Sequence, residues 1–281
     1  MKTLYKLTLI IAIALSTVAC EKEIDLNYKS VDKIYVIEGF TNDTASFVSI
    51  TRTTDMYEPI DTTSKGRVTN ANVIIKDSQG IEHTLLANDS GIYVNNTLRA
   101  NNPLENYTLS VNIDQKTYES KAQLMPRAEI DTLLFCSQTI MSPVTMYSCH
   151  IIMTVDPMKE SYYHYILRHN GKRIITQIHK EEAGKQTKTN IFIPIGVRNS
   201  EGKLILDKDT ERELKEGDTI ELEMRQLDVH TYHYLASVYA ADQTNYNPLP
   251  HFTGGALGYY LPYFISKHTE TFLLDKVLSL D

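Results

Sequence analysis

The fold class is decided by the stretch ANVIIKDSQGIEHTLL, residues Ala71 to Leu86. Its first part is rich in β-branched residues, which favour strands, and its middle, Ser78-Gln79-Gly80, has the composition of a turn. A second apolar run follows the turn, and further along the chain Tyr107–Ile113 alternates apolar and small polar residues. Short strands separated by turn residues are typical of an all-β protein.

The same pattern extends on both sides of this stretch and predicts an N-terminal β-sandwich over residues 33–125. The strands expected in it are residues 34–40, 46–51, 71–77, 81–86, 91–94, 107–113 and 117–122. Their order and turn residues resemble the carboxypeptidase-regulatory type of small, Ig-like β-sandwich. That resemblance implies a fold and no catalytic activity.

A second, sandwich-like β-rich domain is expected over residues 127–281, because proline at Met125-Pro126-Arg127 interrupts strand pairing and the pattern restarts after it. One helix is expected in this domain, over about residues 229–241, with Asp228 as its N-cap. The expected strands are residues 130–136, 147–155, 162–168, 172–179, 190–193, 203–206 and 218–226.

The N-terminus has the features of a bacterial lipoprotein signal. Lys2 and Lys6 precede an apolar run from Leu7 to Val18, which is too short for a transmembrane helix, and Ala19-Cys20 follows. We expect cleavage after residue 19 and lipid attachment to Cys20, whose acyl chains would hold the protein in the outer membrane. An ordinary secretory signal with an incidental cysteine is the alternative.

Charge and composition narrow the range of partners. The chain is 42% hydrophobic and 22% charged, as in ordinary globular proteins. Of its 28 basic and 35 acidic residues, Lys2 and Lys6 are lost with the signal, which leaves a net charge of −9. This balance makes nucleic acid an unsuitable partner. Residues 20–32 form an acidic tether that resembles the export signal of surface-exposed lipoproteins in Bacteroidota; a merely solvated linker is the alternative.

Several motifs in order resemble the Bacteroidota lipoprotein family called domain of unknown function 4249. They include the acidic tether and the four segments Val36–Gly39, Ser49–Asp55, Gly217–Ile220 and Asp228–Leu235. The glycine-rich stretch Thr253–Tyr260 closes the series, although Phe252 and Ala256 replace the family's usual asparagine and second glycine. The resemblance implies a surface lipoprotein typically encoded beside a TonB-dependent transporter, and it supplies no substrate or catalytic residue.

Cys136 and Cys149 are the thiols that remain beside Cys20. They are equidistant from Ser142-Pro143, so we expect them to fall opposite one another in an antiparallel pair. A disulfide is one interpretation, because an exported protein meets an oxidising environment. Two buried free thiols are the other.

No catalytic or metal site can be assembled from the sequence, and we expect neither enzymatic activity nor a cofactor. His230 and His233 are three residues apart on the predicted helix, without the glutamate and third ligand that a zinc site needs. The glycines of residues 254–258 lack the lysine of a phosphate-binding loop and predict a tight bend or a close backbone approach.

Aromatic residues near the C-terminus suggest a recognition surface, because tyrosine combines an apolar ring with a polar tip. The candidates are Tyr246, Phe252, Tyr259, Tyr260 and Tyr263. The alternative is a sheet that is simply rich in aromatic strand formers. Thr44 and Thr62, each after an aspartate, resemble acceptors for O-glycosylation in Bacteroidota.

These features predict a non-catalytic outer-membrane lipoprotein that faces the cell exterior. We expect it to be an accessory or binding partner of a TonB-dependent transporter in nutrient uptake, with a small molecule or peptide as ligand. A surface adhesin or structural lipoprotein with no transport role is the alternative.

Overall fold

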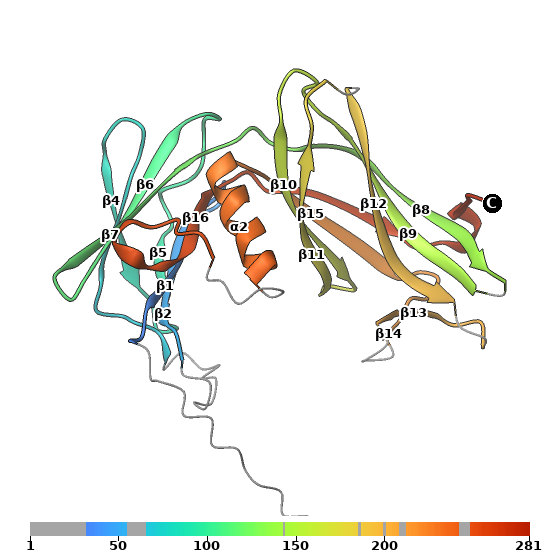
Figure 1. The fold of residues 1–281 in the computed structure, drawn as a ribbon, viewed down its shortest axis with the longest axis horizontal. Helices are drawn as coiled ribbons and strands as arrows, with labels where there is room; N and C mark the ends of the chain where they lie inside the picture. The colour runs from blue at the N-terminus through green and yellow to red at the C-terminus, as the bar shows by residue number, and fades with distance from the viewer. Residues whose placement is uncertain are drawn as a thin grey trace, which may run out of the picture. The chain divides into compact units, whose positions relative to one another are not determined.

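The computed structural model describes residues 32–54, 66–142, 144–184, 187–198, 201–207, 212–241 and 248–281. Within these ranges the chain is mainly β, with one α-helix, α2, and two short 3-10 segments (Figure 1). No helix among the described residues has the length and apolar character needed to span a membrane. The signal at residues 1–19, Cys20 and the tether up to residue 31 lie outside the described residues.

The first sheet has eight strands in the order β16-β1-β2-β5-β4-β3-β6-β7. Neighbouring strands of the sheet pair antiparallel, except that β16 pairs parallel to β1. The strands are β1 (Tyr35–Thr41), β2 (Ser46–Arg52), β3 (Asn72–Lys76), β4 (Glu82–Ala87), β5 (Tyr93–Asn95), β6 (Asn106–Ile113), β7 (Lys116–Gln123) and β16 (Leu257–Pro262).

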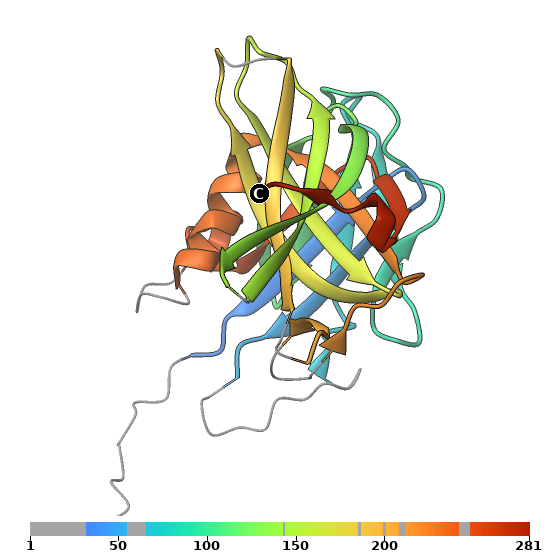
Figure 2. The same cartoon turned by 90° about the vertical axis from the view of Figure 1, so that its right-hand side faces the viewer.

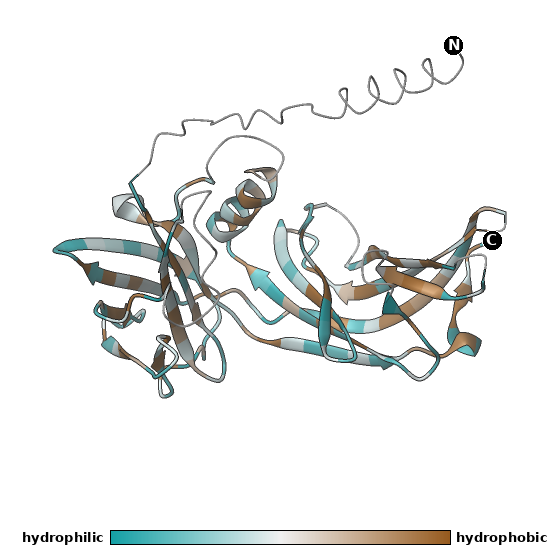
Figure 3. Ribbon diagram, turned by 90° about the horizontal axis from the view of Figure 1, so that it is seen from below, coloured by the Kyte–Doolittle hydropathy of each residue, from teal (hydrophilic) through white to brown (hydrophobic). Residues whose placement is uncertain are grey.

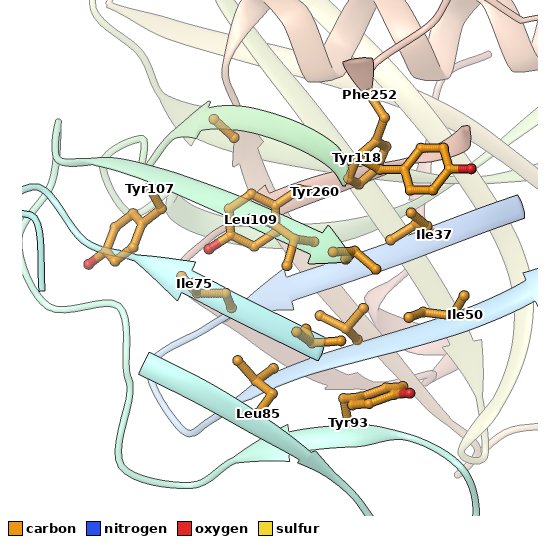
Figure 4. Close-up of a cluster of buried hydrophobic side chains, with 14 of the residues drawn as sticks. Ile37, Ile50, Ile75, Leu85, Tyr93, Tyr107, Leu109, Tyr118, Phe252 and Tyr260 are labelled. Atoms are coloured by element: carbon orange, nitrogen blue, oxygen red, sulfur yellow. The ribbon is translucent and has the colours of Figure 1, made fainter. Parts of the chain in front are cut away.

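Buried and more exposed side chains alternate along these strands, and the buried ones form the first core. In β6, for example, Tyr107, Leu109, Val111 and Ile113 are buried while the residues between them are more exposed. They meet residues from the facing strands, such as Ile37 (Figure 4). Each fully buried side chain of this size contributes about 1.5–3 kcal/mol of transfer free energy. Figure 3 shows the corresponding mixture of hydrophilic and hydrophobic residues along the strands.

The position of β16 shows that the expected domain boundary is wrong for the C-terminal part of the chain. Residues 127–281 were expected to form one separate domain, but β16 joins the first sheet beside β1, and Phe252, Ala256 and Tyr260 belong to the first core. The physical reason is a close backbone approach at Gly258, as the glycine pattern predicted: a Cβ there would lie 2.0 Å from the carbonyl oxygen of Ile37. Only glycine permits this contact, and its φ of +100° also favours glycine.

The second sandwich consists of a four-stranded sheet, β11-β10-β15-β17, and a six-stranded sheet, β14-β13-β12-β9-β8-β18 (Figure 2). Side chains of both sheets, among them Ile151 and Leu222, share a second core. The strands are β8 (Glu129–Met141), β9 (Val144–Thr154), β10 (Ser161–His169), β11 (Lys172–Glu181), β12 (Lys188–Arg198), β13 (Leu204–Asp207), β14 (Arg212–Glu213), β15 (Thr219–Leu227), β17 (Ser266–Thr271) and β18 (Leu278–Ser279).

The two cysteines of this sandwich are free and buried. In the β8–β9 pair, Phe135 lies opposite Cys149 and Cys136 lies opposite Ser148. A register shift between Thr139 and Met141 displaces the pairing by one residue, so the two thiols point to opposite faces of the sheet. The expectation that the cysteines fall opposite one another is therefore wrong, and the structure favours free thiols over a disulfide.

Helix α2 (Val229–Ala241) begins where the sequence predicted, at the cap Asp228. The Oδ1 atom of Asp228 accepts hydrogen bonds from the backbone N–H groups of His230 and Thr231, each 2.9 Å long. Tyr234 and Leu235 join a third apolar cluster with Tyr162, Leu261 and others. The short segments η2 (Thr253–Gly255) and η3 (Leu274–Lys276) complete the described elements.

Candidate functional site

The aromatic residues proposed as a recognition surface are mostly structural. Phe252, Tyr260 and Tyr263 are buried, and Tyr259 is half-buried. The recognition interpretation is wrong for the three buried residues, because Phe252 and Tyr260 fill the first core and Tyr263 fills the third apolar cluster. Tyr246 lies outside the described residues.

The hydroxyl groups of the two buried tyrosines, Tyr260 and Tyr263, make hydrogen bonds within the fold. The hydroxyl of Tyr260 lies 2.9 Å from Oγ1 of Thr41, and Asn42 Nδ2 donates to the hydroxyl of Tyr263 over 3.3 Å. Burial raises the pKa of Tyr260. These hydroxyls stabilise the fold from inside and are not presented to a partner.

Thr44, one of the two threonines proposed for glycosylation, is exposed in the turn between β1 and β2. Its backbone N–H and its hydroxyl both donate to Asn42 Oδ1, over 2.8 and 2.6 Å. The turn therefore holds this side chain at the surface, where a modifying enzyme could reach it. Thr62 lies outside the described residues.

His230 and His233 are exposed on α2. Among the described residues no group of three or more histidine, cysteine, aspartate or glutamate side chains is arranged to hold a metal ion. Both histidines instead line a hollow beside strand β7.

This hollow, the β7 groove, consists of three connected pockets of about 350, 430 and 560 Å³. The first and second share Lys121 and His230, and the second and third share Gln123, Met125 and Glu160. Pockets of this size suit small ligands. The groove is the candidate functional site because it brings together β7, the start of α2 and the residues around Pro250.

One end of the groove, the histidine pocket, is lined by Lys121, His230, His233 and His251 beside Tyr234, Leu249 and Pro250. Among the described residues its lining contains no carboxylate, and the ammonium group of Lys121 makes no ion pair with any of them. An anionic group would therefore find charge-assisted hydrogen bonds here.

The middle of the groove contains Glu160 and Asp228, which already have partners. Glu160 accepts a 2.6 Å hydrogen bond from the Tyr162 hydroxyl and pairs with Lys180 at 2.9 Å. Together, these two partners hold the pKa of Glu160 below its usual range. The carboxylate of Asp228 caps α2, as described above.

His251 connects the histidine pocket to the fold. Its Nδ1 lies 2.7 Å from Ser120 Oγ on β7, and its Nε2 lies 3.3 Å from Thr231 Oγ1 on α2. Thr231 in turn donates to Asp228 Oδ2 over 2.9 Å. Burial lowers the pKa of His251. Because Ser120 is buried, this chain of hydrogen bonds positions the pocket wall and offers no accessible nucleophile.

Sequence reasoning missed Lys121, Gln123 and His251 as site residues. Nothing local marks them, because the groove exists only where β7 is the last strand of its sheet and the segment after α2 returns to it. Of the groove residues, the sequence predicts a role for Asp228 as the helix cap and offers His230 and His233 as an incomplete metal site.

A model of the family described as "Domain of unknown function (DUF4249)" matches residues 21–257. No curated protein matches the chain. Among solved structures, a two-domain fibronectin type III segment from chicken tenascin is similar, with 12% identity and a TM-score of 0.21. That match covers 70% of this chain and 92% of the tenascin segment.

Proposed function

Because this chain belongs to the DUF4249 family, we propose that it is a non-catalytic lipoprotein anchored in the outer membrane through Cys20 and facing the cell exterior. It acts there as an accessory or binding partner of a TonB-dependent transporter in nutrient uptake. The lipoprotein-type signal and the acidic tether support the anchoring, and the association that the family resemblance implies supports the transporter.

The observation that supports a binding role most strongly is the β7 groove. Its three pockets are lined by side chains from separate elements. Hydrogen bonds within the fold hold Glu160, Asp228 and His251 in the wall, whereas Lys121 makes no ion pair with the described residues. A groove of three pockets with a fixed wall suits the binding of a ligand beside a transporter. An adhesin or structural lipoprotein would need no such pocket.

Affinity purification tests the transporter association. The full chain is tagged after Asp281 through a flexible linker, because the side chain of Asp281 bonds to Thr139 and should stay unmodified. Extraction in mild detergent is expected to recover a TonB-dependent transporter with the tagged protein. A Cys20→Ser variant, which cannot be lipidated, is the matched control and is expected to lose the transporter and the membrane fraction together. Recovery of the lipidated protein without any transporter would contradict the proposal.

A further inference from the structure

Strand β7 is the last strand of the eight-stranded sheet, so among the described residues one of its two edges has no hydrogen-bonded neighbouring strand. Segment η2 covers part of this edge. Thr253 Oγ1 accepts a 3.0 Å hydrogen bond from the backbone N–H of Glu119, and Gly254 lies against Thr117 and Tyr118. Segment η2 does not cover the later part of the β7 edge. This part lines the second pocket of the groove, with Lys121, Ala122, Gln123 and Met125.

The direction of the backbone groups on β7 follows from two hydrogen bonds. Glu119 N points to the outer edge, towards Thr253, whereas Leu124 N donates to Glu105 O on the side of β6. Register is regular along the β6–β7 pair, and backbone direction alternates with a period of two. Lys121 and Gln123 therefore direct their N–H and C=O groups into the groove, while Ser120 and Ala122 direct theirs to β6.

An exposed strand edge of this kind is a template for an added strand. The neighbouring pockets are too small for a folded partner and large enough for the side chains of a short peptide. The histidine pocket lies at the Lys121 end, and the described residues of its lining carry only cationic or neutral side chains. The third pocket, at the Gln123 end, contains the carboxylates of Glu129, Asp156 and Glu160 together with Arg127 and Lys159. Asp156 and Glu160 already pair with Lys159 and Lys180, whereas Glu129 makes no ion pair with the described residues.

We propose that the β7 groove binds a short free peptide in extended conformation. Its backbone pairs with Lys121 and Gln123, and its C-terminal carboxylate lies in the histidine pocket. This polarity runs the peptide antiparallel to β7 and places its N-terminal ammonium group towards the carboxylates of the third pocket. The inference rests on the proposed binding function and names the ligand class for it.

The test uses the soluble chain from Glu21 onward and two pools of random pentapeptides, one with a free C-terminal carboxylate and one with a C-terminal amide. After equilibrium dialysis, mass spectrometry quantifies the bound peptides. We expect the amidated pool to bind at least about tenfold more weakly, because it lacks the charge-assisted hydrogen bonds. A third pool, N-methylated at every backbone amide, is expected to lose binding because it has no backbone N–H group left to donate to a strand edge.

Two variants localise the effect on the protein. Lys121→Gln is expected to weaken binding of the free-carboxylate pool about tenfold and to leave the amidated pool unchanged. Lys172→Gln makes the same charge change at an exposed position on β11 and is expected to have no effect. Equal binding of all three pools, or binding that Lys121→Gln does not change, would overturn the inference, as would a dimer that occupies the β7 edge.

The outcome is separable from that of the transporter experiment. Absence of peptide binding together with recovery of the transporter would remove the peptide inference alone. Peptide binding without a transporter would remove the proposed transport role and keep the groove as a peptide site.

Discussion

Gly258 is the residue on which the return of β16 to the first sheet depends. A Cβ at this position would lie 2.0 Å from Ile37 O and 2.6 Å from Ile37 C, both backbone atoms that cannot move aside without breaking the β1–β16 pair. Gly255 offers a matched control, because its φ of +85° is similar but no atom lies within 4 Å of its Cβ position.

We expect Gly258→Ala to lower the free energy of unfolding by about 3 kcal/mol or more, since both a clash and a strained φ are introduced. Gly255→Ala should lower it by only about 1 kcal/mol, from the strained φ alone. Urea denaturation followed by circular dichroism measures both. Equal effects of the two substitutions would show that the close approach of β16 to β1 is not as described.

His164 makes stability depend on pH. It is buried on β10, where its Nε2 lies 2.9 Å from Thr176 Oγ1. Burial, with the nearby charge of Arg225 as a further cause, lowers the pKa of His164 to about 4. In the unfolded chain its pKa is about 6.5, so between these values the unfolded state binds more protons and the folded state loses stability as pH falls.

We expect this histidine to remove roughly 3 kcal/mol of stability between pH 6.5 and pH 4. A His164→Gln variant, which does not titrate, should show a flatter dependence of unfolding free energy on pH across that window. His230→Gln, at an exposed position on α2, serves as the control and should keep the slope of the parent chain. If His164→Gln also leaves the slope unchanged, the histidine is not held neutral by burial.

At the scale of the element, local patterns predicted most strands and the helix. Period-two alternation located β6 and β7, and the cap at Asp228 located α2. Register was less predictable, since it depends on long-range pairing. Met141 pairs with Val144, and continuing that register would place Cys136 opposite Cys149, but the irregularity next to Ile140 shifts the pairing by one residue.

The register of β8 and β9 predicts the state of the thiols. Unreduced chain from Glu21 onward, denatured and treated with a thiol reagent, is expected to give two reactive thiols per molecule, from Cys136 and Cys149. Folded protein should react slowly, because both side chains are buried and burial raises the pKa of each thiol. A count of zero in the denatured state would establish a disulfide and contradict the described register.

At the scale of the whole molecule, the sequence could not show which distant strands share a sheet. Proline at residue 126 correctly marks an interruption between β7 and β8, yet β16 returns to β1 across more than two hundred positions of sequence. The candidate site depends on the same return, because His251 and Thr253 reach β7 only when the chain comes back to the first sheet. Local periodicity contains no information of this kind.

A fragment of residues 33–125 is therefore expected not to fold independently. It lacks β16 and the buried side chains of Phe252, Ala256 and Tyr260, which leaves part of the first core open to water. Differential scanning calorimetry should show no cooperative transition for the fragment and a cooperative one for residues 21–281. A fragment that unfolds cooperatively near the transition temperature of the longer chain would contradict the shared sheet.

The open edge of β7 is the proposed binding site, and hydrogen exchange at single amides tests this assignment most directly. Exchange is measured by NMR on the chain from Glu21 onward, with and without the pool of free-carboxylate pentapeptides. We expect slower exchange at Lys121 and Gln123 in the presence of peptide and no change at Ser120 and Ala122, whose amides already point to β6. Unchanged exchange at Lys121 and Gln123 under saturating peptide would contradict the assignment.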